Sequence, residues 1–230
     1  MLCDTDDAAM RQKVAIFGGT FNPVHNGHLR LALDLVQQLG FDEMRLVPCH
    51  IPTHRADPEV ASARRAQMVT LGIAGNPSLL MDDRELVRGS ASYSVDTLMQ
   101  LRDERGESCS LTLVMGLDAY LGLPKWHRWR ELLDFAHLLV VNRPGYILPS
   151  DGELAEFDRV HRAEKNALAE RSAGAVVHLN IRALDISATE IRALTAAGLS
   201  TRFLLPEPVR RFISEQQLYG ARADAGPRSS

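Results

Sequence analysis

The chain has 230 residues, of which 45% are hydrophobic, and a formal net charge of -3 at pH 7. This is enough apolar material for one large domain with a buried core, and the slight negative charge argues against a protein that coats nucleic acid. Three scattered cysteines exclude a disulfide framework and favour a reducing, cytoplasmic compartment, while the polar N-terminus and the lack of a long apolar run predict neither a secretion signal nor a membrane segment.

Short apolar runs alternate with segments of helical periodicity along the chain. Residues 14–17 are apolar and lead into Gly18 and Gly19, which predicts a buried strand entering a tight turn. Apolar residues at helical spacing then run to Leu39, and Gly40 is a typical helix stop. The other expected elements, in chain order, are a strand at 44–47, a helix at 58–74, a strand at 79–81, a helix at 94–105, strands at 111–115 and 138–141, an exposed charged helix at 153–171, a strand at 176–179, and helices at 189–197 and 208–218.

This alternation predicts an α/β fold, a Rossmann-like doubly wound parallel sheet with helices on both faces and two helices at the C-terminal end. We expect residues 1–12 to be a flexible N-terminal segment, residues 13–220 to form one domain, and the small polar residues 221–230 to be a disordered tail. The sequence leaves a homo-oligomeric state open.

The turn after the first strand contains the most informative motif. Gly18 and Gly19 allow a phosphate to approach the backbone, and the helix that follows offers free N–H groups and a positive dipole end. His25 and His28, in the run HNGH, are three residues apart and fall on one face of that helix, while Gly27 leaves room beside them. A plain tight turn or half of a metal site are the alternatives. Neither common phosphate-loop pattern, GxxxxGK[ST] or GxGxxG, is present.

A second motif follows about 160 residues later, where residues 185–192 read DISATEIR. Ser187 or Thr189 can cap the helix that follows, and Arg192 can point its guanidinium at the β- and γ-phosphates of a nucleotide. Taken alone, this segment would be an ordinary helix start with a surface arginine.

Together, HNGH and ISATEIR resemble the two signatures of the HxGH nucleotidyltransferase superfamily, in which the histidines hold ATP phosphates. The resemblance implies that His25, His28 and Arg192 are the catalytic donors. It also implies that ATP is bound by two sets of residues, Gly18, Gly19, Thr20 and Phe21 in the first turn and Ser187 and Thr189 in the second motif.

The middle of the chain resembles bacterial nicotinate-mononucleotide adenylyltransferases, and the likeness extends over residues 13–220. The matching segments are IPTHR at 51–55 for the family's xPPHR/K, ASYSVDTL at 91–98 for SYTxxTL, GLD at 116–118 with Trp126 for GxDxxxxxxxW, NRPGY at 142–146 for RPGY, and LLPEPV at 204–209 for LLPxxV. Thr53 stands where the family has a second proline, a difference that can loosen this loop.

An indole face suits a flat, electron-poor pyridine ring, and Trp126 supplies one. The family likeness implies that backbone N–H groups of Ser94, Val95 and His127 hold the nicotinate carboxylate, and donors of this kind favour an acid over a carboxamide. Gly116 and Asp118 are expected at the adenosine, with the Asp118 carboxylate accepting ribose hydroxyls. The remaining expected mononucleotide contacts are His54, Arg55 and Arg143. A zinc site at Cys49, His50 and His54 lacks the usual spacing, and no metal site built by the chain is expected.

The expected reaction joins ATP and nicotinate mononucleotide by in-line attack of the acceptor phosphate, with Mg²⁺ bound through the ATP phosphates. A phosphate monoester is already largely dianionic at neutral pH, so no enzyme nucleophile is needed. One alternative is pantetheine-phosphate adenylyltransferase, against which the chain length, Trp126 and the SYSVDTL segment argue. The other is a nucleotide-sensing regulator without catalysis, which would not need both motifs intact.

Overall fold

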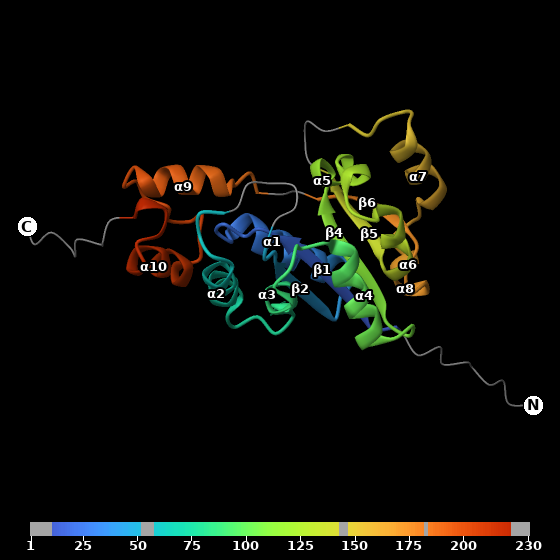
Figure 1. Ribbon diagram of the computed structural model, residues 1–230, viewed down its shortest axis with the longest axis horizontal. Coiled ribbons are helices and arrows are strands. Elements are labelled where there is room, and N and C mark those ends of the chain that lie inside the picture. The colour runs from blue at the N-terminus through green and yellow to red at the C-terminus, as the bar shows by residue number, and fades with distance from the viewer. Residues whose placement is uncertain (1–10, 52–57, 143–146, 182–183, 222–230) are drawn as a thin grey trace, which may run out of the picture.

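A computed structural model describes residues 11–51, 58–142, 147–181 and 184–221. Its centre is a six-stranded, all-parallel sheet with strand order β3-β2-β1-β4-β5-β6 (Figure 1). The strands are β1 (Lys13–Gly19), β2 (Glu43–Pro48), β3 (Leu79–Met81), β4 (Ser110–Gly116), β5 (His137–Asn142) and β6 (Val176–Asn180). This confirms the predicted Rossmann-like doubly wound sheet.

Strand β1 lies at the middle of the sheet because its apolar residues are buried on both faces. Phe17 pairs with Leu46 of β2 on one side and with Val114 of β4 on the other. The chain runs outward from β1 through β2 to β3, returns to β4, and then runs outward the other way. The order therefore reverses between β1 and β4, and in open α/β sheets ligands bind beyond the carboxyl ends of the strands at such a switch point.

Helices follow the strands and cover the two faces of the sheet. The α-helices are α1 (Asn26–Leu39), α2 (Ser62–Ile73), α3 (Arg84–Arg88), α4 (Ser94–Arg105), α5 (Leu117–Leu121), α6 (Leu132–Phe135), α7 (Glu153–His161), α8 (Ala167–Glu170), α9 (Ala188–Ala196) and α10 (Glu207–Glu215), and short 3₁₀ helices occupy Leu123–Lys125, Trp129–Glu131 and Leu218–Gly220. Figure 1 shows α2, α9 and α10 together at one end of the molecule and α4, α6 and α7 at the other.

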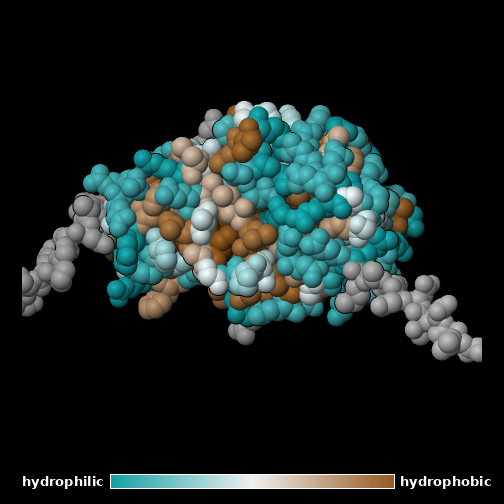
Figure 2. All heavy atoms as spheres, turned by 90° about the horizontal axis from the view of Figure 1, so that it is seen from below, coloured by the Kyte–Doolittle hydropathy of each residue, from teal (hydrophilic) through white to brown (hydrophobic). Residues whose placement is uncertain are grey.

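Two hydrophobic cores lie on opposite faces of the sheet. The first packs α1, α2, α8, α9 and α10 against side chains such as Phe17 and Leu46. The second packs α4, α5, α6 and α7 against side chains such as Ile16 and Leu113. Figure 2 shows mostly hydrophilic atoms on one face of the molecule, with smaller hydrophobic patches near its middle. None of the helices within the described part of the chain is long and apolar enough to cross a membrane.

Two sequence-based predictions of helices need correction. The helix expected at 58–74 begins only at Ser62. The single exposed helix expected at 153–171 is wrong, because the segment forms α7 and α8 with a break between them. In that break Ala163 donates its backbone N–H to the Val176 carbonyl at 2.9 Å, and Leu154 and Leu168 are buried. Pairing with β6 therefore overrides the helical propensity of this segment.

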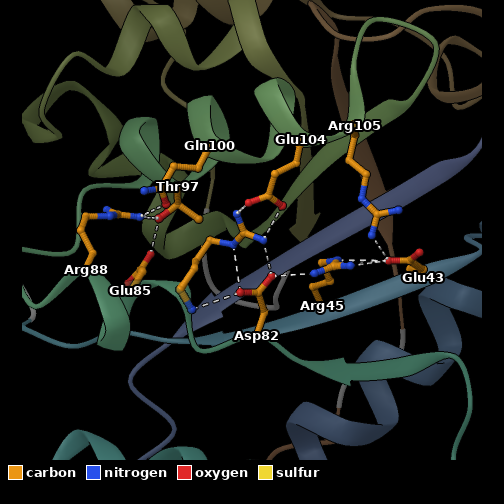
Figure 3. A network of polar contacts seen from close by, with 10 residues as sticks. Glu43, Arg45, Asp82, Glu85, Arg88, Thr97, Gln100, Glu104 and Arg105 are labelled. Atoms are coloured by element: carbon orange, nitrogen blue, oxygen red, sulfur yellow. Dashed lines mark hydrogen bonds and ion pairs between the residues drawn. The ribbon is translucent and has the colours of Figure 1, made fainter.

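A network of charged side chains joins β2, the β3–α3 turn and α4 (Figure 3). Asp82 accepts hydrogen bonds from Arg45 at 2.8 Å and from Arg84 at 2.9 and 2.8 Å. Arg84 also pairs with Glu104 of α4 at 3.0 Å. The network fixes α4 relative to the sheet, and the N-terminus of α4 borders the cavity described next.

Candidate active site

The β1–α1 turn brings two imidazole rings into contact. His25 occupies the N-cap position of α1 in an extended conformation, and His28 lies in the first helical turn. Their ring centroids are 3.7 Å apart with an interplanar angle of 24°, and the edge of Phe21 supports His28 at 5.1 Å. A Cβ atom on Gly27 would come within 3.0 Å of His25 Nδ1. Because Gly27 has no side chain, the His25 ring can lie in the space beside it.

A second glycine, Gly19, is closely packed just before this pair. Phe21 has a positive φ of 46°, and its buried ring packs back over the end of β1. A Cβ atom on Gly19 would come within 3.1 Å of that ring. The sequence pattern Gly-Gly-Thr-Phe thus folds into a turn whose backbone is covered by an aromatic ring on one side and open to the cavity on the other.

The C-terminal helices return to this same turn. Arg192 of α9 donates from Nη1 to the Asn22 carbonyl at 2.8 Å, and the Tyr219 hydroxyl donates to Asn22 Oδ1 at 2.6 Å. Burial raises the pKa of Tyr219, which keeps its hydroxyl protonated as a donor. The backbone N–H of Asn26 donates to the Leu204 carbonyl at 2.9 Å. The guanidinium of the second motif and the imidazoles of the first motif therefore meet at one loop.

Ser187 occupies the N-cap position of α9. Its side chain makes no capping hydrogen bond in the part of the chain that the structure describes, so the cap expected from Ser187 or Thr189 is not formed by Ser187. Thr189 instead contacts the guanidinium of Arg192, with Nη2 and Oγ1 3.2 Å apart. This contact orients Arg192 beside the turn.

A cavity of about 410 Å³ opens at the switch point between β1 and β4. The carboxyl ends of these strands form its floor, and the N-terminus of α4 and the 3₁₀ helix Leu123–Lys125 form its walls. The predicted site residues that line it are Gly18, Gly19, Thr20, Ser94, Gly116, Asp118, Trp126 and His127. Segments that are far apart in the sequence are thus brought together.

One wall of the cavity combines an aromatic surface with a helix terminus. Trp126 is half-buried at the end of its 3₁₀ helix, and the rings of Tyr93 and His127 lie 4.5 Å apart beside it. Ser94 is the first residue of α4. The opening N–H groups of a helix have no partner within the helix and carry a partial positive charge, so this wall favours a flat ligand that ends in an anion.

The remaining predicted site residues lie outside the cavity lining. Phe21 and Val95 are buried, with 2% and 0% of the residue exposed, and neither lines the cavity. His25 and His28 lie in the neighbouring β1–α1 turn, and Arg192, Ser187 and Thr189 lie on α9 next to it. His54, Arg55 and Arg143 fall outside the described residues.

Sequence reasoning missed several residues that line the cavity, namely Cys49, Glu85, Ser92, Tyr93, Gly122 and Lys125. Glu85 is buried, and its carboxylate accepts a hydrogen bond from Thr97 Oγ1 at 2.7 Å. Burial raises the pKa of Glu85, against the opposing effect of hydrogen bonds from Ser92 and Thr97. Glu85 lies on a short helix whose five residues give no amphipathic pattern, so only its nearness to the SYSVDTL segment could have indicated it.

The described residues contain no group of three or more His, Cys, Asp or Glu side chains that could hold a metal ion.

Comparison with known proteins agrees with this arrangement. A family model described as "Cytidylyltransferase-like" matches residues 16–194. Two relatives share the name "Probable nicotinate-nucleotide adenylyltransferase". The protein from Cellvibrio japonicus is 49% identical over 210 residues, covering 91% of this chain and 100% of the relative. The protein from Hahella chejuensis is 46% identical over 210 residues, covering 90% of this chain and 96% of the relative.

Solved structures share the fold at low sequence identity. The Plasmodium falciparum nicotinic acid mononucleotide adenylyltransferase complexed with NaAD aligns with a TM-score of 0.69 at 14% identity, over 91% of this chain and 98% of that one. An identity of 14% shows only that the two proteins share a fold. The identities of 46–49% to the two relatives show which family the chain belongs to. The chain belongs to the nicotinate-nucleotide adenylyltransferase family.

Proposed function

We propose that the chain transfers the adenylyl group of ATP to nicotinate mononucleotide, forming nicotinate adenine dinucleotide and pyrophosphate. One observation supports this most strongly. The stacked pair of His25 and His28 and the guanidinium of Arg192 meet at the turn that borders the cavity at the switch point. Cationic and N–H donors at this place suit a triphosphate. The names of the relatives supply the reaction class.

The two substrates occupy different parts of this region in our proposal. The triphosphate lies over the β1–α1 turn, where His25, His28 and Arg192 converge, and Asp118 accepts hydroxyls of the adenosine ribose. The pyridine ring lies against Trp126, and its carboxylate binds the N–H groups that open α4 at Ser94. A solved relative from Plasmodium falciparum is described as complexed with NaAD, a ligand that would span both parts.

The chemistry is a single displacement at the α-phosphorus of ATP. An oxygen of the acceptor's 5′-phosphate forms the new P–O bond while the bond to the β-phosphate oxygen breaks, and pyrophosphate leaves with that electron pair. The nucleophile is already largely dianionic near neutral pH, so the chain needs no covalent intermediate. Its contribution is to hold the two phosphates in line and to stabilise the charge that develops on the leaving group. His28 and Arg192 are the donors that we assign to this charge.

Magnesium would be held mainly by the triphosphate and by water, and it would offset phosphate charge when bound. The residues of the chain act around that complex. The turn at Gly18 and Gly19 brings backbone close to the phosphates, and the imidazole pair donates to them. His54, Arg55 and Arg143 complete the mononucleotide contacts in this proposal, as the family motifs imply.

The test is a pyrophosphate-release assay with ATP and each of three acceptors. We expect rapid release with nicotinate mononucleotide, slower release with nicotinamide mononucleotide, and background release with phosphopantetheine. Dominant activity with phosphopantetheine would reassign the acceptor. Release with none of the three acceptors, from a chain that still binds ATP, would instead favour a nucleotide-sensing role.

A further inference from the structure

Arg65 of α2 is a buried arginine whose guanidinium binds only backbone carbonyl groups and a thiol within the described residues. The residue is 1% exposed. Its Nη1 donates to the Thr20 carbonyl at 2.6 Å, and its Nη2 donates to the Cys49 carbonyl at 2.7 Å and to the His50 carbonyl at 3.2 Å. Nε donates to the Val60 carbonyl at 3.1 Å. One side chain thus joins three separate stretches of backbone.

In the proposed reaction, two of these stretches of backbone bind different substrates. Thr20 lies in the β1–α1 turn, which we assign to ATP. Cys49 and His50 directly follow β2 and lead into the segment IPTHR, which we assign to the acceptor mononucleotide. Thr20 and Cys49 both line the cavity. Arg65 therefore lies behind the cavity wall and ties the two substrate loops to each other.

Holding two loops together with a buried guanidinium has a high cost in free energy. Removing a charge from water is unfavourable unless its hydrogen bonds are satisfied, and a well-packed apolar residue is often at least as stabilising at such a position. What arginine adds is geometry, because its planar fork fixes several acceptors at set directions. Lysine carries the same charge on a single flexible ammonium group and cannot reproduce this arrangement.

We propose that Arg65 is a positioning residue that sets the spacing between the triphosphate loop and the acceptor loop, an inference that rests on the proposed function. In-line displacement depends on this spacing, since a misplacement of about 1 Å can lower the rate about 10²-fold. We expect each loop to keep its own substrate contacts without Arg65, because none of the contacts assigned above is made by Arg65 itself. The effect of losing Arg65 is therefore concentrated in the complex that holds both substrates.

The chain contains a matched control in Arg102 of α4. Arg102 is 6% exposed, and its guanidinium also binds backbone carbonyls. Nη1 donates to those of Gly106 and Cys109 at 2.7 and 2.8 Å, and Nη2 donates to those of Phe135 and Ser172 at 2.7 and 2.9 Å. Cys109 directly precedes β4, so this second guanidinium lies at the amino-terminal edge of the sheet, away from the cavity lining.

The experiment compares Arg65→Lys with Arg102→Lys. Denaturant unfolding measures stability, calorimetry measures the Kd of ATP and of nicotinate mononucleotide separately, and a single-turnover assay with both substrates saturating measures the chemical step. We expect both variants to lose stability and to keep each Kd within about threefold of the parent chain. We expect only Arg65→Lys to lose turnover, by about 10- to 100-fold.

The outcomes separate this inference from the proposed function. No pyrophosphate release by the parent chain with nicotinate mononucleotide would refute the proposed function. An active parent chain, with Arg65→Lys turning over as fast as Arg102→Lys, would refute the positioning role. If Arg65→Lys does not fold, Arg65→Met removes the charge and answers the same question. Failure of both Arg65 variants to fold, beside a folded Arg102→Lys, would assign Arg65 to stability alone and overturn the proposal.

Discussion

At the scale of single residues, Gly27 determines how close the two imidazoles of the HNGH motif can lie. A Cβ atom at position 27 would come within 3.0 Å of His25 Nδ1 and 3.1 Å of Cε1. Position 27 is the second residue of α1, where only part of the roughly 1 kcal/mol preference of a helix interior for alanine applies. We expect Gly27→Ala to lower kcat, because the His25 ring must move, and to change the free energy of unfolding by no more than about 1 kcal/mol. Denaturant unfolding and steady-state kinetics on the same preparation check this, and unchanged kcat would show that the ring position is not critical.

His28 is the second residue on which turnover should depend. Removing one preorganised donor to developing charge costs roughly 10²–10³ in rate, and we expect a loss of this size in kcat for His28→Ala. His137 provides the control, because its ring is fully buried at the start of β5 and contacts the backbone of Arg171 and Ala175. His137→Ala should lower the melting temperature and leave kcat of the folded protein unchanged. Near-parental turnover by His28→Ala would remove His28 from the mechanism.

Substitution of Trp126 should weaken the binding of one substrate more than that of the other. Trp126 lines the cavity in the part that we assign to the acceptor, and offset aromatic stacking contributes about 0.5–1.5 kcal/mol beyond area burial. We expect Trp126→Ala to raise KM for nicotinate mononucleotide about tenfold, with a smaller change in KM for ATP. Trp129, three residues on, is buried against Phe157 and serves as the control, since Trp129→Phe should affect stability alone. Equal changes for both substrates in Trp126→Ala would argue against stacking.

At the scale of elements, the position of α4 depends on the charged network around Asp82 (Figure 3). Burial by itself would raise the pKa of Asp82, but hydrogen bonds from Arg84 and Arg45 outweigh burial and hold this pKa below its ordinary value. The unfolded chain therefore binds this proton more readily than the folded chain. The stability contributed by Asp82 is present above pH about 4 and is lost as the pH falls through its folded pKa.

Removing one partner of a buried ion pair costs about 3–5 kcal/mol, and we expect Asp82→Asn to lower the free energy of unfolding at pH 7 by about 3 kcal/mol. The difference between variant and parent should shrink as the pH is lowered below about 4, because the parent then loses the same charge. Denaturant unfolding at a series of pH values measures this. A difference that stays constant with pH would show that Asp82 contributes through shape and not through charge.

Several elements were predictable from the sequence. The strand expected at 14–17 is β1, and the helix expected at 94–105 is α4. Prediction failed where tertiary contacts determine the secondary structure. An example is the break between α7 and α8, where the backbone of Ala163 pairs with that of Val176. The short helices α3, α5 and α6 have four or five residues each, too few to show a helical period. Glu85 lies on one of them and was missed for the same reason.

At the scale of the whole molecule, the sheet order determines which parts of the sequence share a site. Because β1 and β4 are neighbours, the turn after Gly19 and the turn after Gly116 open into one cavity. The family motifs predicted both turns, since each is local in the sequence. The role of Arg65 was not predictable from local motifs. Its side chain lies on α2, outside both turns, and binds the backbone carbonyls of Thr20 and of His50, which are 30 residues apart in the sequence.

The return of α9, α10 and the segment after them to the β1–α1 turn also bears on how the protein is made. Asn22 and its partner Tyr219 are 197 residues apart in the sequence. During translation, the six strands, the last of which ends at Asn180, leave the ribosome before Tyr219 does, so the turn at Asn22 exists for most of synthesis without this partner. A nascent chain can therefore form its sheet early, but the hydrogen bond that holds Asn22 forms only once the segment around Tyr219 has emerged.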